Sequence, residues 1–314
     1  MRKTLALLGQ TFLLFAALTA VLPGQAAAQA YVTDRMLLNA DKDANNWLFY
    51  GRDYAGTRFS PLGQINRDNV KKLVPKWVFQ FGVVDGQDSQ AIVNNGVLYI
   101  TSSWNKVFAL DAKTGKMIWR YDYQLPEDIT KFLCCDVVNR GVALYKDKAY
   151  FTTLDAHVVA LDAKTGKEVW KTRIEDYQTG ITTTMAPLPL RNKIIIGVAG
   201  AEYPTRLFVQ AFDADSGASV WKTYTIPAPG EPGSDTWPRT DAYKFGGGST
   251  WITGSYDPEQ NTLYWPVGNP TPDLDGDVRP GDNLYTNSTL ALDPDTGRMK
   301  FHFQYTPHDV WDYD

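Results

Sequence analysis

The two cysteines of the 314-residue chain, Cys134 and Cys135, are adjacent in the segment FLCCDVVNRG (Phe132–Gly141). The Cα atoms of ordinary disulfides lie roughly 4.4–6.8 Å apart, whereas neighbouring Cα atoms lie about 3.8 Å apart across a trans peptide. A bond between these two thiols would therefore close a small ring with a bent peptide. The alternatives are two inert buried thiols or a two-thiol zinc site, which would lack nearby histidines.

Two carboxylates at the end of the sequence, Asp312 and Asp314, are separated by one residue in WDYD. In an extended segment residues i and i+2 face the same side, so both carboxylates would point at one ion. Carboxylates held this close repel each other unless a cation lies between them. The pair therefore indicates a site for a highly charged cation. The alternative is that Asp314 is simply a solvated last residue.

Other acidic residues have ordinary structural interpretations. Asp273, Asp275 and Asp277 in PDLDGDV resemble a calcium loop, but no glutamate ends the stretch. We therefore predict a solvated loop there. His308 and Asp309, shortly before WDYD, are predicted to be structural.

Residues 1–30 have the composition of a secretory signal peptide. Arg2 and Lys3 precede an apolar run, and the tripeptide AQA at 28–30 supplies a small-x-small cleavage site. A retained anchor helix is the alternative. Export would place the two cysteines in an oxidising compartment, the periplasm, where disulfides persist.

The charge of the chain argues against some partners. Without the signal, 29 basic and 35 acidic residues give a net charge of −6. No basic run remains, so nucleic acid and anionic membrane surfaces are poor candidate partners.

The elements that must position these groups are repeated. The four copies of the repeat are ALDAKTGKMIW (Ala109–Trp119), ALDAKTGKEVW (Ala160–Trp170), AFDADSGASVW (Ala211–Trp221) and ALDPDTGRMKF (Ala291–Phe301). The first three end in tryptophans spaced 51 residues apart, and the step to Phe301 is 80, so that interval carries an insertion. Periods of this length indicate propellers or solenoids.

Each repeat has the pattern of one propeller blade. An alternating apolar run precedes the A-x-D strand, a tight turn at T-G follows, and a third strand delivers the tryptophan. We predict that Trp119, Trp170 and Trp221 are wedges between neighbouring blades. The fold class is therefore all-β, with about four to five blades of an incomplete ring over residues 31–314. Because an open ring leaves apolar faces and strand edges in water, we expect the chain to be a fragment that does not fold stably alone.

Taken in order, the motifs resemble those of the quinoprotein alcohol dehydrogenases, the methanol and ethanol dehydrogenase family that uses pyrroloquinoline quinone (PQQ). Besides the repeat they are NWLFYGRDYAGTRFSPLGQIN (Asn46–Asn66), CCDVVNRG, GAE (Gly200–Glu202), GGGSTW (Gly246–Trp251), GNP (Gly268–Pro270), RPGDN (Arg279–Asn283) and TPHDVWDYD (Thr306–Asp314). The resemblance implies an eight-bladed β-propeller, of which this chain would be roughly the first half.

The resemblance also implies how the cofactor is held between two flat surfaces. Cys134 and Cys135 would form a disulfide that packs against one face of the planar quinone. Trp251 would cover the opposite face.

Polar contacts to the cofactor are implied in the same way. Arg140 would pair with a cofactor carboxylate, for which a planar guanidinium is suited, and a surface arginine is the alternative. Thr184 would donate a hydrogen bond, although neighbouring threonines leave the register open. Asp88 and Ala199 occupy positions where the family often has Glu and Ser, so these two cofactor contacts would be shortened or lost. Gly200, the next residue after Ala199, is also expected to contact the cofactor.

The resemblance implies that Glu202, Asn269 and Asp312 are ligands of a hard cation, with Asp312 also the catalytic base. All three side chains offer oxygen atoms, which Ca²⁺-like ions prefer. A further carboxylate from Asp314 gives three negative charges, which match a trivalent ion such as La³⁺ or Ce³⁺ better than Ca²⁺. The lanthanide-dependent branch of the family carries an aspartate at this position.

The expected function is the oxidation of a primary alcohol to an aldehyde, with electrons passed to a c-type cytochrome and a homodimer possible. The alternative is a non-catalytic exported propeller, such as an outer-membrane assembly scaffold. A scaffold of that kind is not expected to have vicinal cysteines.

Overall fold

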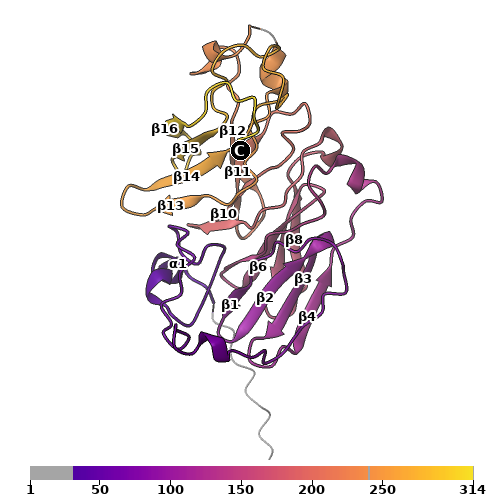
Figure 1. Ribbon diagram of the computed structural model, residues 1–314, viewed down its shortest axis with the longest axis vertical. Helices are drawn as coiled ribbons and strands as arrows, with labels where there is room; N and C mark the ends of the chain where they lie inside the picture. Colours follow the sequence, from indigo (N-terminus) through magenta and orange to yellow (C-terminus); the bar gives the residue numbers. More distant parts are fainter. Residues whose placement is uncertain (1–30, 240, 314) are drawn as a thin grey trace, which may run out of the picture.

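A computed structural model describes residues 31–239 and 241–313, so the predicted signal peptide and Asp314 lie outside the described residues. Within these residues the chain forms four antiparallel sheets of four strands each (Figure 1). No helix in this part of the chain is long and apolar enough to cross a bilayer. The predicted all-β architecture of successive blade-like sheets is confirmed.

In each sheet the strands follow one another in chain order. The first sheet contains β1 (Ile92–Asn94), β2 (Val97–Ser102), β3 (Lys106–Asp111) and β4 (Met117–Asp122). The second contains β5 (Ala143–Tyr145), β6 (Lys148–Thr153), β7 (His157–Asp162) and β8 (Glu168–Arg173). The third contains β9 (Leu188–Leu190), β10 (Lys193–Gly197), β11 (Phe208–Asp213) and β12 (Ser219–Tyr224). The fourth contains β13 (Ser255–Asp257), β14 (Thr262–Val267), β15 (Ser288–Leu292) and β16 (Met299–Gln304).

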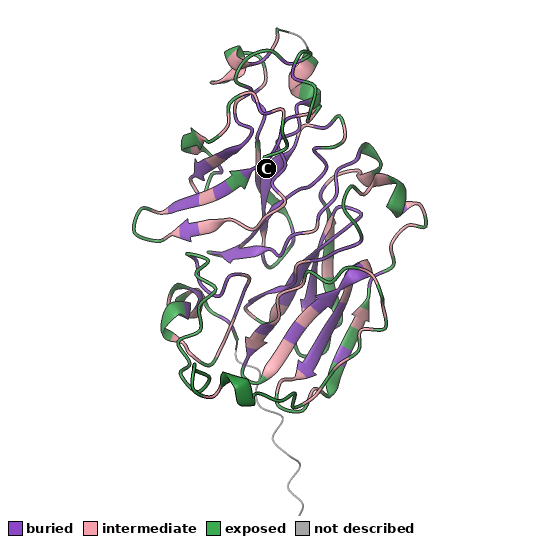
Figure 2. Ribbon diagram, viewed as in Figure 1, coloured by how far each residue is buried: buried purple, intermediate pink, exposed green. Residues whose placement is uncertain are grey.

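The helical elements are short and lie outside the sheets. They are α1 (Asp34–Leu38) and the 3₁₀ turns η1 (Ala40–Lys42), η2 (Val70–Lys72), η3 (Ser103–Asn105), η4 (Ile129–Phe132), η5 (Tyr177–Thr179), η6 (Ser234–Thr236) and η7 (Asp241–Phe245). The middle strands of the sheets are mostly buried, whereas the outermost strands β4, β8, β12 and β16 are largely exposed (Figure 2).

The aspartate of each repeat organises the turn between the third and fourth strands. The carboxylate of Asp111 accepts hydrogen bonds from the backbone of Lys113 and from both the backbone and the hydroxyl of Thr114. Asp162, Asp213 and Asp293 repeat this pattern at the corresponding turns. Side-chain capping of this kind explains why the sequence repeats A-x-D before every turn.

The repeated tryptophans connect each sheet to the next, as predicted. The indole Nε1 atoms of Trp119, Trp170 and Trp221 donate to the carbonyls of Ala163, Ala214 and Pro294 at 3.0, 3.2 and 3.1 Å. The ring of Trp119 lies on the turn glycine of the following sheet, Gly166, where an added Cβ would come within 2.6 Å of the ring. Glycine is therefore required at this turn because the indole occupies the space of a side chain.

An additional tryptophan makes the same contacts before the first sheet. Trp77 Nε1 donates to the carbonyl of Ala112 at 3.2 Å. Phe79 and Phe81 each lie 5.4 Å from the ring of Phe108 in β3. No described residue pairs with this segment as a strand, although its contacts are those of an outermost strand. Trp77 was not assigned to a blade from the sequence.

The segment from Trp47 to Tyr54 contacts the first strand of every sheet. Its hydrogen bonds join Trp47 to Val93 of β1, Leu48 to Leu144 of β5, and Tyr54 to both Pro189 of β9 and Tyr256 of β13. Leu48, Phe49 and Tyr54 are buried by these contacts. This segment, called the hub below, ties the four sheets to one another.

Candidate cofactor and cation site

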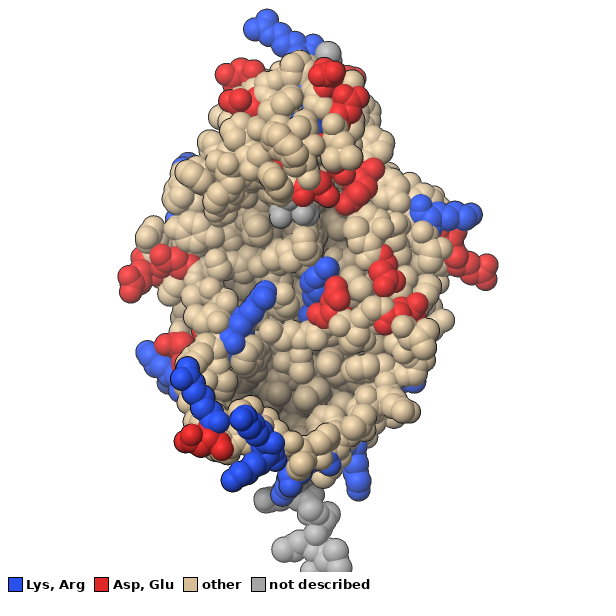
Figure 3. All heavy atoms as spheres, viewed as in Figure 1, with Lys and Arg blue, Asp and Glu red and all other residues tan. Residues whose placement is uncertain are grey.

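A cavity of about 250 Å³ lies where loops from the second, third and fourth sheets meet. Figure 3 shows this face of the molecule hollowed near its middle, with acidic and basic side chains in the hollow. The lining residues are Leu133, Cys134, Cys135, Asp136, Val138, Arg140, Thr182, Thr184, Ala199, Gly200, Glu202, Ser249, Trp251 and Asp312. Nine of the residues predicted from the sequence are therefore brought together from positions far apart in the chain.

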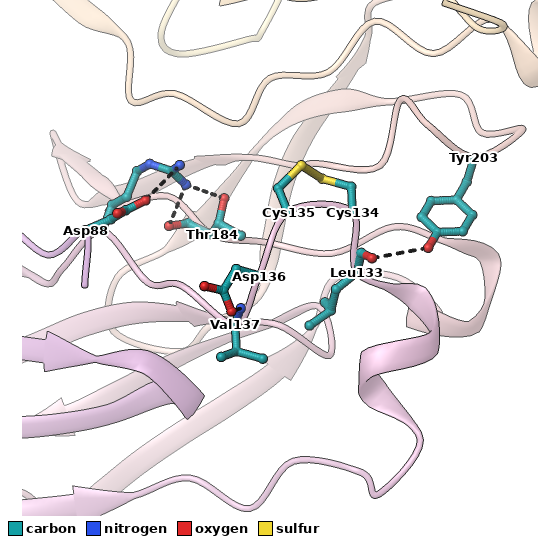
Figure 4. Close-up of a disulfide and its surroundings, with 9 residues drawn as sticks. Asp88, Leu133, Cys134, Cys135, Asp136, Val137, Thr184 and Tyr203 are labelled. Atoms are coloured by element: carbon teal, nitrogen blue, oxygen red, sulfur yellow. Dashed lines mark hydrogen bonds and ion pairs between the residues drawn. A yellow bond between two sulfur atoms is a disulfide. The ribbon is translucent and has the colours of Figure 1, made fainter. Parts of the chain in front are cut away.

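Cys134 and Cys135 form a disulfide in the loop that follows η4 (Figure 4). Both residues are exposed, and they face the cavity. A carboxylate oxygen of Glu202 and the two sulfur atoms all lie within 4.8 Å of one another. Because the sulfur atoms are bonded to each other, neither is a thiolate, which removes the alternative of a two-thiol zinc site.

Arg140 is fixed on the cavity wall by three neighbours. Its Nη1 donates to the hydroxyl of Thr184 at 2.7 Å, and its Nη2 lies 3.4 Å from a carboxylate oxygen of Asp88 (Figure 4). The guanidinium carbon lies 4.7 Å from the centre of the Trp251 ring. Burial lowers the pKa of Arg140, and the charge of Asp88 opposes this effect. The arginine is thus a preoriented donor beside an indole, not a solvated surface residue.

Of the three neighbouring threonines, Thr182 and Thr184 line the cavity, whereas Thr183 does not. Thr184 faces Arg140 and the cavity, and Thr182 also lines the cavity. Thr183 is buried, with its hydroxyl hydrogen-bonded to the carbonyl of Thr153. The alternation follows from the extended backbone, in which successive side chains point to opposite sides.

Backbone geometry around Gly200 shapes the cavity floor. Ala199 and Thr182 exchange two backbone hydrogen bonds of 2.8 and 3.1 Å. At Gly200, φ is +124°, and an added Cβ would lie 2.1 Å from the carbonyl oxygen of Gly180. Only glycine allows these two segments to approach so closely.

Ser249 was not singled out from the sequence, although it lines the cavity. Its hydroxyl is buried and has no hydrogen-bond partner among the described residues. A buried hydroxyl without a partner is unfavourable, so this atom fits a polar ligand in the cavity. Its position two residues before Trp251, on the same side of an extended segment, is the signal that could have identified it.

The acidic residues form one cluster, and Asp273 belongs to it. Asn269 is buried, and its Nδ2 donates to a carboxylate oxygen of Asp273 at 2.5 Å. Burial raises the pKa of Asp273 to about 6, and the nearby charges of Asp312 and Glu202 add to the effect. The prediction of a solvated loop was therefore wrong for Asp273, which is partly buried by its contact with Asn269. Asp275 and Asp277 are exposed, as predicted for a solvated loop.

The residues present fit both a planar anionic ligand and a hard cation. A disulfide and an indole provide flat surfaces, and Arg140 with Ser249 provides polar partners for carboxylate or carbonyl oxygens. Burial is the main cause of the raised pKa of Asp273, and the charges of Asp312 and Glu202 add to it; a cation beside these carboxylates would relieve their repulsion. Asn269 is buried and does not itself line the cavity; its Nδ2 is bonded to the Asp273 carboxylate, which leaves its Oδ1 as the atom that could bind a cation.

Successive four-stranded blades around such a cavity define a β-propeller of the ligand-binding class. A family model described as the PQQ glucose/ethanol/alcohol dehydrogenase β-propeller domain matches residues 47–314. The chain belongs to this family.

Relatives of known name are similar over nearly the whole chain. A quinoprotein alcohol dehydrogenase of Pseudomonas putida is 43% identical over 307 residues, covering 92% of this chain and 51% of the relative. The crystal structure of a quinohemoprotein alcohol dehydrogenase from Comamonas testosteroni has a TM-score of 0.84 at 40% identity, covering 90% of this chain and 44% of that one. A europium-containing methanol dehydrogenase has a TM-score of 0.85 at 36% identity, covering 89% and 52%. The chain thus spans about half the length of these relatives.

Proposed function

We propose that the chain forms the cofactor-binding part of a PQQ-dependent alcohol dehydrogenase of the periplasm. The observation that carries the proposal is a single cavity that combines a vicinal disulfide, Arg140 and Trp251 with the carboxylates of Glu202 and Asp312. The names of the relatives support it, since they are quinoprotein and quinohemoprotein alcohol dehydrogenases. Family membership favours this enzyme over the alternative of a non-catalytic scaffold.

Oxidation of a primary alcohol to an aldehyde removes a proton from oxygen and a hydride from carbon. Bound PQQ supplies the hydride acceptor, and a bound hard cation polarises the quinone carbonyl. Asp312, which is exposed in the cavity, takes the hydroxyl proton on a carboxylate oxygen. Arg140 and Thr184 orient a carboxylate of the cofactor, and the disulfide and Trp251 exclude water from its flat faces.

The cation is proposed to be a lanthanide such as La³⁺ or Ce³⁺ in preference to Ca²⁺. Glu202, Asn269 and Asp312 would hold it, and Asp314 from the sequence motif would add a third negative charge. Support comes from the charges of Asp312 and Glu202, which act on the nearby Asp273, and from the europium named in the similar methanol dehydrogenase structure.

The electron acceptor is proposed to be a c-type cytochrome. Two relatives are quinohemoproteins by name, and a haem group is an electron carrier of the kind such an acceptor needs. A homodimer stays a prediction.

Cofactor binding tests the proposal directly. Titration with PQQ should quench tryptophan fluorescence, because Trp251 lines the cavity. Arg140→Lys keeps the charge but loses the planar fork, so PQQ affinity should fall about 10- to 100-fold. Arg173→Lys is the control, because Arg173 is exposed and its partners, the Asp176 carboxylate and the Glu175 carbonyl, do not line the cavity. A wild-type protein that does not bind PQQ would support the scaffold alternative.

Metal preference tests the lanthanide assignment separately. In a full-length version of the protein, dehydrogenase activity reconstituted with PQQ should be restored much better by La³⁺ or Ce³⁺ than by Ca²⁺, and Asp314→Ala should remove the preference. Equal or better reconstitution by Ca²⁺ would contradict the lanthanide assignment and leave the PQQ proposal standing.

A further inference from the structure

One guanidinium connects the two loops that carry Asn269 and Asp312. Arg279 is 1% exposed, and its donors reach four carbonyl oxygens. These acceptors are Pro272 O at 2.9 Å, Asp273 O at 2.9 Å, the side-chain Oδ1 of Asn283 at 2.8 Å, and Asp309 O. The first two acceptors belong to the loop of Asn269, and the last belongs to the segment that ends at Asp312.

The second loop is organised from its buried end by Asp309. The carboxylate of Asp309 is completely buried and accepts from the backbone N–H groups of Trp311 and Tyr313 at 3.1 and 3.0 Å. These two residues flank Asp312, whose φ of +64° is uncommon for a residue with a side chain. Asn287 completes the arrangement by donating to Asp309 at 3.1 Å and to the carbonyl of Tyr313 at 2.7 Å. Asp312 is therefore held in an unusual conformation by its neighbours.

The first loop is organised from the other side of the same guanidinium. Arg279 holds the backbone of Pro272 and Asp273, and the carboxylate of Asp273 holds the amide of Asn269. A planar guanidinium has five N–H donors in fixed directions, enough for the four acceptors of Arg279, whereas an ammonium group has only three.

We propose that Arg279 is a positioning residue for the cation site, which sets the spacing between Asn269 and Asp312. This inference rests on the proposed function, because it assigns a role within the cation site proposed above. Arg279 acts through backbone carbonyls and does not itself touch the cation. Residues that orient metal ligands in this way typically affect metal affinity 10- to 100-fold.

Terbium binding without PQQ measures this role independently of enzyme activity. Tb³⁺ bound near Trp251 and Trp311 should luminesce when the indoles are excited, and a titration gives its dissociation constant. Arg279→Lys should weaken Tb³⁺ binding at least about 10-fold. The matched control is Arg52→Lys, because Arg52 is also buried and donates to the carbonyls of Asp41 and Asp43, outside the cavity. The control should change the affinity less than about 3-fold, a shift well below that range.

Thermal melting of each variant separates positioning from a general loss of stability. If Arg279→Lys does not fold, Arg279→Gln replaces it with the same expectation, because the glutamine amide has only two N–H donors for the four acceptors of Arg279. A folded Arg279 variant with wild-type Tb³⁺ affinity, or an equal loss in Arg52→Lys, would overturn the inference while leaving the proposed function intact. A wild-type protein that does not bind Tb³⁺ would instead refute the proposed cation site, and this inference with it.

Discussion

Replacement of Gly200 by alanine tests how closely the cavity floor is packed. The new Cβ would lie 2.1 Å from the carbonyl oxygen of Gly180, so the two segments would have to separate by about 1.3 Å to reach ordinary contact. Overpacking of this kind costs about 1–3 kcal/mol. The φ of +124° lies outside the left-handed well near +57°, which adds a further strain of about 1–3 kcal/mol for a residue with a side chain. We expect a total loss of about 2–6 kcal/mol in the free energy of unfolding.

The assay is urea unfolding of the full-length protein, because the chain alone is not expected to fold stably; unfolding is followed by tryptophan fluorescence and analysed by linear extrapolation. Gly230→Ala is the control, because Gly230 has a φ of +87° and no atom within 4 Å of the added Cβ. The control should lose only about 1–2 kcal/mol from backbone strain. Equal losses in the two variants would show that the contact with Gly180 does not constrain the site. PQQ affinity should fall with Gly200→Ala, since Ala199 and Glu202 would move with the backbone.

Three further predictions concern the repeat and the disulfide. Trp221→Phe should destabilise the protein by about 1–2 kcal/mol, because it removes the indole N–H that donates to Pro294. Trp311→Phe on the surface should change the stability by less than about 0.5 kcal/mol, and equal effects of the two substitutions on urea unfolding would contradict the wedge role of Trp221. Hydrogen bonds from Ser216 lower the pKa of Asp213 despite burial, so this carboxylate stabilises the folded state above pH 3.8, and the stabilisation is lost as the pH falls further. The melting temperature of Asp213→Asn should therefore be lower than that of the wild type at pH 7. A difference in melting temperature that does not shrink toward pH 3 would be evidence against this linkage. Thiol titration of the denatured, unreduced protein from the periplasm should find no free thiol, and free Cys134 and Cys135 in that material would exclude the disulfide.

The repeat made the fold predictable from local signals. The aspartate, the turn glycine and the tryptophan lie within eleven residues, so one copy contains the turn, both flanking strands and the wedge. Trp77 carries none of these signals, because its own segment lacks the preceding turn. Its role becomes visible only through Ala112 and Phe108, which belong to the next sheet.

The sequence predicted which residues line the candidate site better than it predicted the hydrogen bonds and the burial of those residues. The ordered motifs identified the disulfide, Arg140 and Trp251, and the structure brings them into one cavity. The inward position of Asp273 depends on its pairing with Asn269 and on the buried arginine six residues later, which the acidic spacing of PDLDGDV does not reveal. The isolated hydroxyl of Ser249 likewise results from tertiary packing, which no local pattern records.

The hub has a consequence for how the four sheets fold. In an array of repeats that contact only their neighbours, stability is a sum of local terms and folding can begin at any unit. Here the Tyr54 hydroxyl bonds Pro189, 135 residues away in sequence, and the Tyr54 carbonyl bonds Tyr256, farther still. Contacts of such high sequence separation slow folding, because the loop must close before the contact stabilises anything. In the full-length protein we therefore expect the four sheets to unfold as one cooperative unit, and not blade by blade from one end.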